Sequence, residues 1–420
     1  MGSCTAVPTT LDLPTHEATR KGVSMTCQVV LGNGHGVVVA SDVTVTTGEN
    51  RTHDTAPKIH PMPPPHCLAV LHSGDVNFHG LPYGVLIQEW MRSLGNVQLR
   101  HTAAYRDSFL DWLRDNISRT SEEHERDFDA VWSMNGRFGY LHRTLVEHLR
   151  TIPEDQHAWA TEQFIKSAVL DLEGSRDLDG HTDSRVNNAV RRLWEFQSDE
   201  LSLRARLEYW FDDVPRNDSI DELLERFVHL QVQKNFSPSG IANLAFVGFG
   251  GDELFANHAP VKIGGSVGRD LFSFTSPSSA VNDTWPHQLT RFSAQFDAIE
   301  EFLLGYSDSL IDTAGSRLSL PEPDNHEPNQ SDEAGLLTGR SLTETFLREV
   351  GAAAEEKRMT PFYQAVSSLP LLTLAETAKT LVGLQALKNL IQAETPSVSK
   401  SAETALITRA DGFRWIEHLT

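Results

Sequence analysis

The placement of strand-like segments constrains the fold of this chain more than any other feature of its sequence. Gln28–Leu31 and Gly36–Ala40 are β-branched runs around Gly32-Asn33-Gly34, which predicts two strands joined by a tight turn. Similar short runs follow at Val43–Gly48, Lys58-Ile59, Cys67–Leu71, Ile241–Phe249, Val261–Ile263, Leu271–Phe274, Glu403–Thr408 and Phe413–Glu417. Strands near both ends with helices between them indicate a layered α/β or α+β domain.

Helical patterns occupy most of the remaining sequence. An amphipathic segment predicts a helix from about Tyr83 to Leu94, and residues 99–238 alternate apolar positions with charges, as solvated helices do. Further helices are predicted near 287–305, 341–356 and 373–394. Within residues 310–345, the stretch 318–336 holds five acids, three prolines and no Lys or Arg, which is typical of a disordered loop.

The composition argues against several classes of protein. The chain of 420 residues carries 57 acidic residues against 36 Lys and Arg, a formal net charge of −21, which repels a polyanion such as nucleic acid. It has no run of 18 uninterrupted apolar residues, so we expect no membrane span. The first 25 residues lack the apolar run of a signal peptide, and three cysteines are too few for a disulfide scaffold. We therefore expect a cytoplasmic protein.

Three polar residues near the start of the strand series have an informative spacing. Thr26 follows Met25, Asp42 stands 16 residues after Thr26, and Lys58 stands 32 residues after it. With these residues the sequence resembles the β-type proteasome subunits and their bacterial proteasome-like relatives, which are N-terminal nucleophile hydrolases. The surrounding residues that carry the resemblance are Thr26-Cys27, Val37–Asp42, Thr46-Thr47-Gly48, Pro57-Lys58-Ile59 and Ser73-Gly74-Asp75.

The resemblance implies an α+β fold of the αββα type, in which two antiparallel sheets stack between helical layers, here enlarged by a helical insertion. The resemblance implies four segments. Residues 1–25 would be a leader or propeptide, 26–98 the first part of the hydrolase-like domain, 99–238 the helical insertion, and 239–420 the second part of that domain, which contains the predicted loop at 310–345. Relatives of this fold assemble into rings, which implies a homo-oligomer. The implied substrate is a peptide or a small amide, and no metal or organic cofactor is implied.

The resemblance also implies a role for each residue of the motif. A Thr hydroxyl is a poor nucleophile unless a base removes its proton, and an N-terminal amine with a pKa of about 8 can act as that base. Thr26 would be the nucleophile and its own amine the base, with Lys58 as the nearby cation and Asp42 as the ion-pair partner of Lys58. The backbone N–H of Gly74 would donate to the oxyanion.

Three further positions match the family elements less fully. Ser293 corresponds to a serine that assists the amine, and Glu394 with Ser397 corresponds to an acid-x-x-Ser element. The family has Asp where this chain has Glu394, and two glycines where it has Val398-Ser399. Met25 also replaces the usual Gly before the nucleophile, so residues 1–24 would be either a cleavable propeptide or an extension ahead of a start at Met25.

Each of these residues also has a simpler interpretation. Asp42 and Lys58 could form a structural ion pair, Gly74 could be a turn glycine, and Ser293 and Ser397 could be surface or capping serines. The whole chain could then be a non-catalytic interaction protein whose helical insertion binds a partner. Five histidines crowd residues 53–79, but their spacing is not that of a zinc site, so we interpret them as solvated or core residues.

Overall fold

The structure is a computed structural model. It describes residues 26–47, 51–53, 57–117, 122–132, 134–174, 183–196, 202–235, 240–267, 270–281, 287–307, 348–392, 398–399 and 401–418. The predicted leader and the predicted loop at 310–345 therefore lie outside the described residues. The described chain combines helices with antiparallel sheets, which confirms the α+β class.

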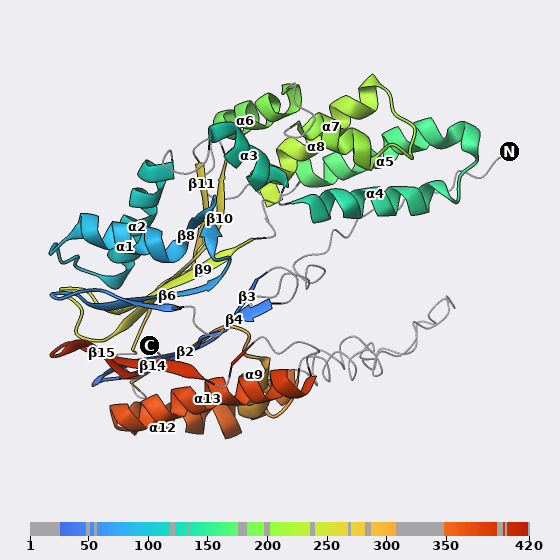
Figure 1. The fold of residues 1–420 in the computed structure, drawn as a ribbon. Helices are drawn as coiled ribbons and strands as arrows, with labels where there is room; N and C mark the ends of the chain where they lie inside the picture. The colour runs from blue at the N-terminus through green and yellow to red at the C-terminus, as the bar shows by residue number, and fades with distance from the viewer. Residues whose placement is uncertain are drawn as a thin grey trace, which may run out of the picture.

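The first large sheet has five strands in the order β13-β1-β2-β14-β15, and every neighbouring pair is antiparallel. Its strands are β1 (Cys27–Asn33), β2 (Gly36–Asp42), β13 (Gln288–Ala294), β14 (Ala402–Thr408) and β15 (Gly412–Glu417). All residues of β1 and β2 are buried, because these inner strands are covered on both faces. The sheet thus joins segments from the beginning, middle and end of the sequence (Figure 1).

The second large sheet has six strands in the order β11-β10-β9-β6-β5, with β12 paired to β10. Its strands are β5 (Ile59–Pro61), β6 (Cys67–Gly74), β9 (Ala242–Phe249), β10 (Asn257–Val267), β11 (Asp270–Thr275) and β12 (Ser279–Ala280). The structure also describes two small antiparallel ribbons. One pairs β3 (Val45–Thr47) with β4 (Arg51–His53), and the other pairs β7 (Asn77–Phe78) with β8 (Leu81–Pro82).

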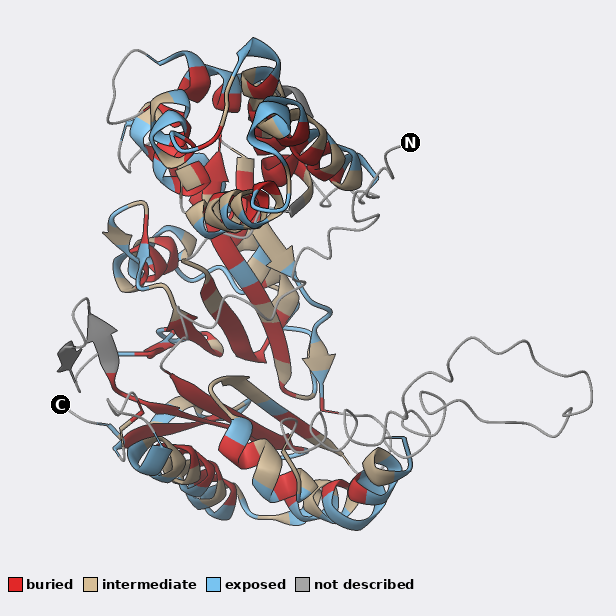
Figure 2. Ribbon diagram, turned by 90° about the vertical axis from the view of Figure 1, so that its right-hand side faces the viewer, coloured by how far each residue is buried: buried red, intermediate tan, exposed pale blue. Residues whose placement is uncertain are grey.

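The two large sheets pack face to face, and helices cover their outer faces (Figure 1). The core between the sheets includes Val39 of β2, Leu71 of β6 and Val247 of β9. The first sheet carries α9 (Asp297–Leu304), α12 (Thr360–Ser368) and α13 (Leu371–Gln392), and the second carries α1 (Tyr83–Leu94) and α2 (Thr102–Asn116). Figure 2 shows the buried residues concentrated in the sheets and the inner helix faces.

The remaining helices form a separate unit at one end of the sandwich (Figures 1 and 2). They are α3 (Glu123–Trp132), α4 (Asn135–Leu149), α5 (His157–Glu173), α6 (Asp183–Glu195), α7 (Leu203–Trp210) and α8 (Asp218–Asn235). Their apolar faces make one core, which Val267 of β10 and Phe272 of β11 enter from the sheet. Helix α2 falls within residues 99–238 but packs on the second sheet, as α1 does.

Comparison with the predicted elements gives both agreement and correction. The helix at Tyr83–Leu94 and the terminal strand pair are confirmed. The single helix predicted near 287–305 is wrong: residues 288–294 are β13, which pairs along the whole of β1, and only α9 is helical. The turn of the first hairpin lies at Gly34-His35, one step later than predicted. Helix α12 was not predicted.

Candidate functional site

Thr26 lies immediately before β1, at the end of the sandwich where β2 finishes. It is 5% exposed, and its carbonyl accepts a hydrogen bond from the backbone N–H of Gln295 at 2.7 Å. Strand β1 is held between β2 and β13, so the backbone that leads out of Thr26 is fixed from both sides. The candidate nucleophile therefore directly precedes a strand that is paired on both edges.

Asp42, the last residue of β2, is fully buried beside this point. Its Oδ1 accepts a hydrogen bond from the backbone N–H of Cys27 at 2.8 Å, and its Oδ2 accepts one from the N–H of Thr44 at 3.1 Å. The hairpin register explains the contact, because β1 and β2 bring residues 28 and 41 opposite each other. The carboxylate is thereby held against the peptide group that follows Thr26.

Lys58 lies just before β5, an edge strand of the second sheet, and pairs with Asp42. Its Nζ donates to both carboxylate oxygens of Asp42, at 3.0 and 3.1 Å, and both side chains are almost wholly buried. Burial raises the pKa of Asp42, while the charge of Lys58 and the two backbone donors offset part of that rise. Burial also raises the pKa of the neighbouring Cys27 thiol, so Cys27 stays protonated and is a poor alternative nucleophile.

Strand β6 brings Gly74 to the same end of the molecule. The backbone N–H of His72 donates to the carbonyl of Lys58 at 2.9 Å, and the carbonyl of His72 accepts from Nε2 of Gln28 at 2.9 Å. Gly74 follows two residues later with φ of +85°, in the left-handed region. The structure thus gathers Thr26, Asp42, Lys58 and the Gly74 turn at one end of the sandwich.

The other predicted residues have different outcomes. Ser293 lies on β13 rather than on a helix, opposite Gln28, and its Oγ donates to Oε1 of Gln28 at 3.1 Å. This contact places Ser293 two residues along the strand from Thr26, where it supports β1. Glu394 and Ser397 lie outside the described residues.

Gln28 and His72 form a hydrogen-bonded pair that sequence reasoning did not single out as part of the site. Burial lowers the pKa of His72 to about 4, so its ring is neutral, and Nε2 donates to the carbonyl of Asp75 at 2.8 Å. The Oγ of Ser73 is buried and has no hydrogen-bond partner among the described residues. A polar Gln28 opening an otherwise apolar strand was the available sequence signal, because a buried amide needs partners.

We expect the substitution Gly74→Ala to be far more costly than Gly80→Ala. Both glycines have a positive φ, +85° and +81°, which costs an alanine about 1 kcal/mol. A Cβ on Gly74 would stand 2.1 Å from the carbonyl oxygen of Ile241, whereas a Cβ on Gly80 would meet nothing within 4 Å. Urea denaturation should therefore show a loss of about 3 kcal/mol or more for Gly74→Ala and about 1 kcal/mol for Gly80→Ala. Equal losses would contradict the tight packing of this turn.

No protein-family model matches the chain, and no curated protein matches it. Among the described residues, no helix is long and apolar enough to cross a membrane. The same residues contain no group of three or more His, Cys, Asp or Glu side chains placed to hold a metal ion.

Proposed function

We propose that this protein hydrolyses amide bonds with Thr26 as an N-terminal nucleophile, on the fold of the proteasome-like hydrolases. One observation carries the proposal: the buried Lys58–Asp42 pair is hydrogen-bonded to the backbone N–H that follows Thr26. The helix–sheet–sheet–helix layering supports it, because that layering is the sandwich implied by the resemblance. The proposed substrate is a peptide or a small amide.

The chemistry requires that the bond between Met25 and Thr26 be broken, since only then does Thr26 carry an amine. The positive charge of Lys58 nearby favours the neutral amine, which is the form that accepts a proton. As Oγ of Thr26 bonds to the substrate carbonyl carbon, the amine takes the hydroxyl proton. The N–H of Gly74 donates to the oxyanion that forms.

The second half of the reaction returns the site to its starting state. The protonated amine gives its proton to the leaving nitrogen, the carbon–nitrogen bond breaks, and an ester remains on Oγ of Thr26. Water then attacks this ester, which releases the carboxylic acid and restores the hydroxyl. No other co-reactant is consumed.

The state of the N-terminus tests this proposal directly. Intact-mass measurement and N-terminal sequencing of the purified full chain should find that residues 1–25 have been removed and that Thr26 carries a free amine. A matched sample of the Thr26→Ala variant should keep these residues if Thr26 itself promotes the cleavage. A full-length wild-type chain with an intact Met25–Thr26 bond would contradict the hydrolase.

A second candidate function is a non-catalytic interaction protein on the same fold. Helices α3–α8 favour this alternative, because they build a core of their own, to which Val267 of β10 and Phe272 of β11 contribute from the sandwich. Such a unit has the character of a partner-binding module. In that case residues 1–25 would stay attached, and the same mass measurement would separate the two functions. Ring assembly and a cytoplasmic location belong to either proposal.

A further inference from the structure

One hydrogen bond joins the strand that follows Thr26 to the strand that ends at Gly74. Nε2 of Gln28, on β1, donates to the carbonyl of His72, on β6, at 2.9 Å. Gln28 stands two residues after Thr26, and His72 stands two residues before Gly74. Both side chains are buried, so water does not compete for this bond. It therefore ties the two sheets together beside the proposed nucleophile and the proposed oxyanion donor.

Bonds on both sides fix the orientation of the Gln28 side chain. Its Oε1 accepts from Oγ of Ser293, which lies opposite on β13, at 3.1 Å. An amide oxygen can only accept and an amide nitrogen can only donate, so Nε2 must face the His72 carbonyl. Gln28 thus connects β13, β1 and β6 next to Thr26.

The imidazole of His72 holds the backbone on the far side of Gly74. Its Nε2 donates to the carbonyl of Asp75 at 2.8 Å, because a carbonyl can only accept. Burial lowers the pKa of His72 to about 4, so the ring is neutral and keeps its single proton on Nε2. The N–H of Asp75 also donates to the carbonyl of Ile241 at 3.0 Å. The chain is therefore fixed before and after the glycine.

The same bonds indicate where the backbone N–H of Gly74 points. The N–H of His72 donates to the carbonyl of Lys58 at 2.9 Å, and N–H groups two residues apart leave a strand on the same edge. Asp75, one residue after Gly74, donates in the other direction, to Ile241 directly before β9. The N–H of Gly74 therefore leaves β6 toward the side of Lys58 and away from β9.

We propose that Gln28 and His72 are positioning residues for the hydrolysis, and that together they set where the N–H of Gly74 lies relative to Thr26. This inference rests on the proposed function, since it assigns both residues to that reaction. An oxyanion donor stabilises the transition state only when it is held where the negative charge forms. The pair acts through the backbone without touching the substrate, so its loss lowers kcat and leaves KM nearly unchanged.

Steady-state kinetics of the full chain on fluorogenic peptide amides tests the role of His72. His72→Met removes the Nε2 donor, and it should lower kcat by about 10-fold to 100-fold while KM changes by less than about 3-fold. His72→Gln keeps an N–H donor on a side chain of similar reach, so its kcat should stay within about 5-fold of the wild type. Gln28→Met, which breaks the bond between the sheets, should lower kcat by about 10-fold.

His66→Met is the matched control for the imidazole. His66 is also buried and directly precedes β6 at its opposite end. Its Nε2 likewise donates to a backbone carbonyl, that of Gly95, at 2.8 Å. This variant should lose stability as His72→Met does, but it should keep the kcat of the wild type.

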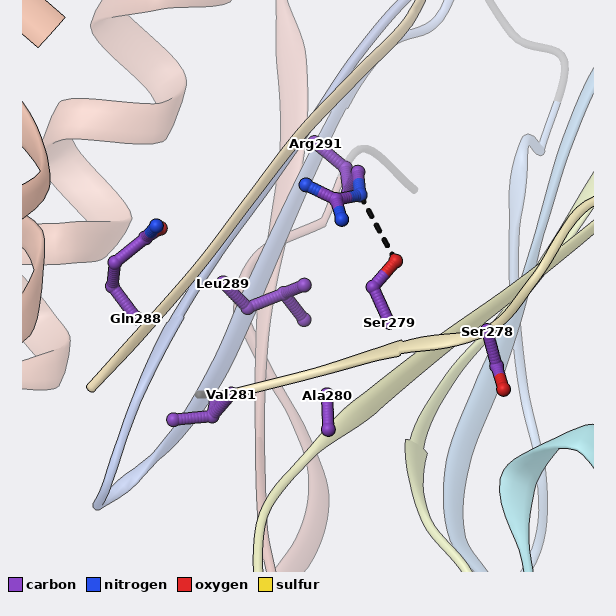
Figure 3. Close-up of a pocket in the computed structure, with 7 residues that line it drawn as sticks. All are labelled: Ser278, Ser279, Ala280, Val281, Gln288, Leu289 and Arg291. Carbon is purple, nitrogen blue, oxygen red and sulfur yellow. Dashed lines mark hydrogen bonds between the residues drawn. The ribbon is translucent and has the colours of Figure 1, made fainter. Parts of the chain in front are cut away.

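Arg291→Gln is the control for a bond between the sheets. Nε of Arg291, on β13, donates to Oγ of Ser279, on β12, at 3.1 Å, beside a cavity of about 400 Å³ (Figure 3). Arg291 stands opposite Val30, so with a rise of about 3.3 Å per residue this position lies about 13 Å along β1 from Thr26. Loss of this bond should leave kcat unchanged.

Hydrogen–deuterium exchange gives a readout that does not depend on activity. The amides of residues 72–77 should exchange about 10-fold faster in His72→Met than in the wild type, because the turn loses a bond. The positioning role would be overturned by unchanged exchange, by equal losses of kcat in His72→Met and His66→Met, or by a kcat in His72→Gln as low as in His72→Met. A wild type that hydrolyses no amide would contradict the proposed function instead, and exchange would still show whether His72 holds the turn.

Discussion

Thr26→Ala is expected to lower kcat/KM for amide substrates by at least about 1,000-fold, because the variant has no oxygen that can form the acyl intermediate. Thr26→Ser should keep a large part of the activity, since it keeps the hydroxyl. The assay compares these variants with the wild type on a mixed set of fluorogenic peptide amides, using chains whose N-terminus has been determined. Thermal unfolding of the same samples checks that the fold survives.

A matched control separates loss of the nucleophile from loss of a buried threonine. Thr404 on β14 is 1% exposed in the same sheet, and its Oγ1 has no hydrogen-bond partner among the described residues. Thr404→Ala should leave hydrolysis unchanged while costing a comparable amount of stability. Undiminished activity in Thr26→Ala would remove Thr26 from the mechanism, whatever its effect on folding.

Breaking the buried ion pair from one side should cause the largest loss of stability that we predict. Lys58→Met leaves the Asp42 carboxylate buried without its cation, and Asp42→Asn removes the carboxylate to which Lys58 donates two hydrogen bonds. Each single variant is expected to lose about 3–5 kcal/mol in urea unfolding. The double variant removes both charges, so its loss should be smaller than the sum of the single losses by about 1–3 kcal/mol.

An exposed pair on α2 is the control for this cycle. Arg114 and Asp111 are 47% and 74% exposed, so their coupling should be below about 0.5 kcal/mol. Activity then distinguishes the two roles of the buried pair. If Lys58 acts on the Thr26 amine, the double variant folds but does not hydrolyse amides. A double variant that folds and stays active would make the pair purely structural.

Several parts of the site could be predicted from local sequence because they depend on one hairpin. The β-branched runs within residues 28–40 predict two paired strands, and pairing across a short turn brings the residue after Thr26 beside Asp42. Lys58 lies outside this hairpin, so its position depends on contacts between more distant segments. Its carbonyl accepts a hydrogen bond from the N–H of His72, and its Nζ donates to both carboxylate oxygens of Asp42.

The role of Gln28 could not be predicted in this way, because its partners are distant in the sequence. Its side chain contacts Ser293 of β13 and the His72 carbonyl of β6, residues separated from it by 265 and 44 positions. The wrong prediction of a helix at residues 288–294 has the same cause, because the partner strand β1 is distant in the sequence. Residues 288–294 carry an ambiguous local pattern, and their pairing along β1 makes them a strand.

The sequence by itself indicated a layered α/β or α+β domain and predicted the first and last hairpins and the helix α1. These features follow from periodicity and turn residues, which act between neighbours in the chain. Only the tertiary structure decided that the Lys58–Asp42 pair is buried and that α2 belongs to the sandwich. Burial and charge pairing depend on which strands meet in space, and that is set by contacts across hundreds of residues.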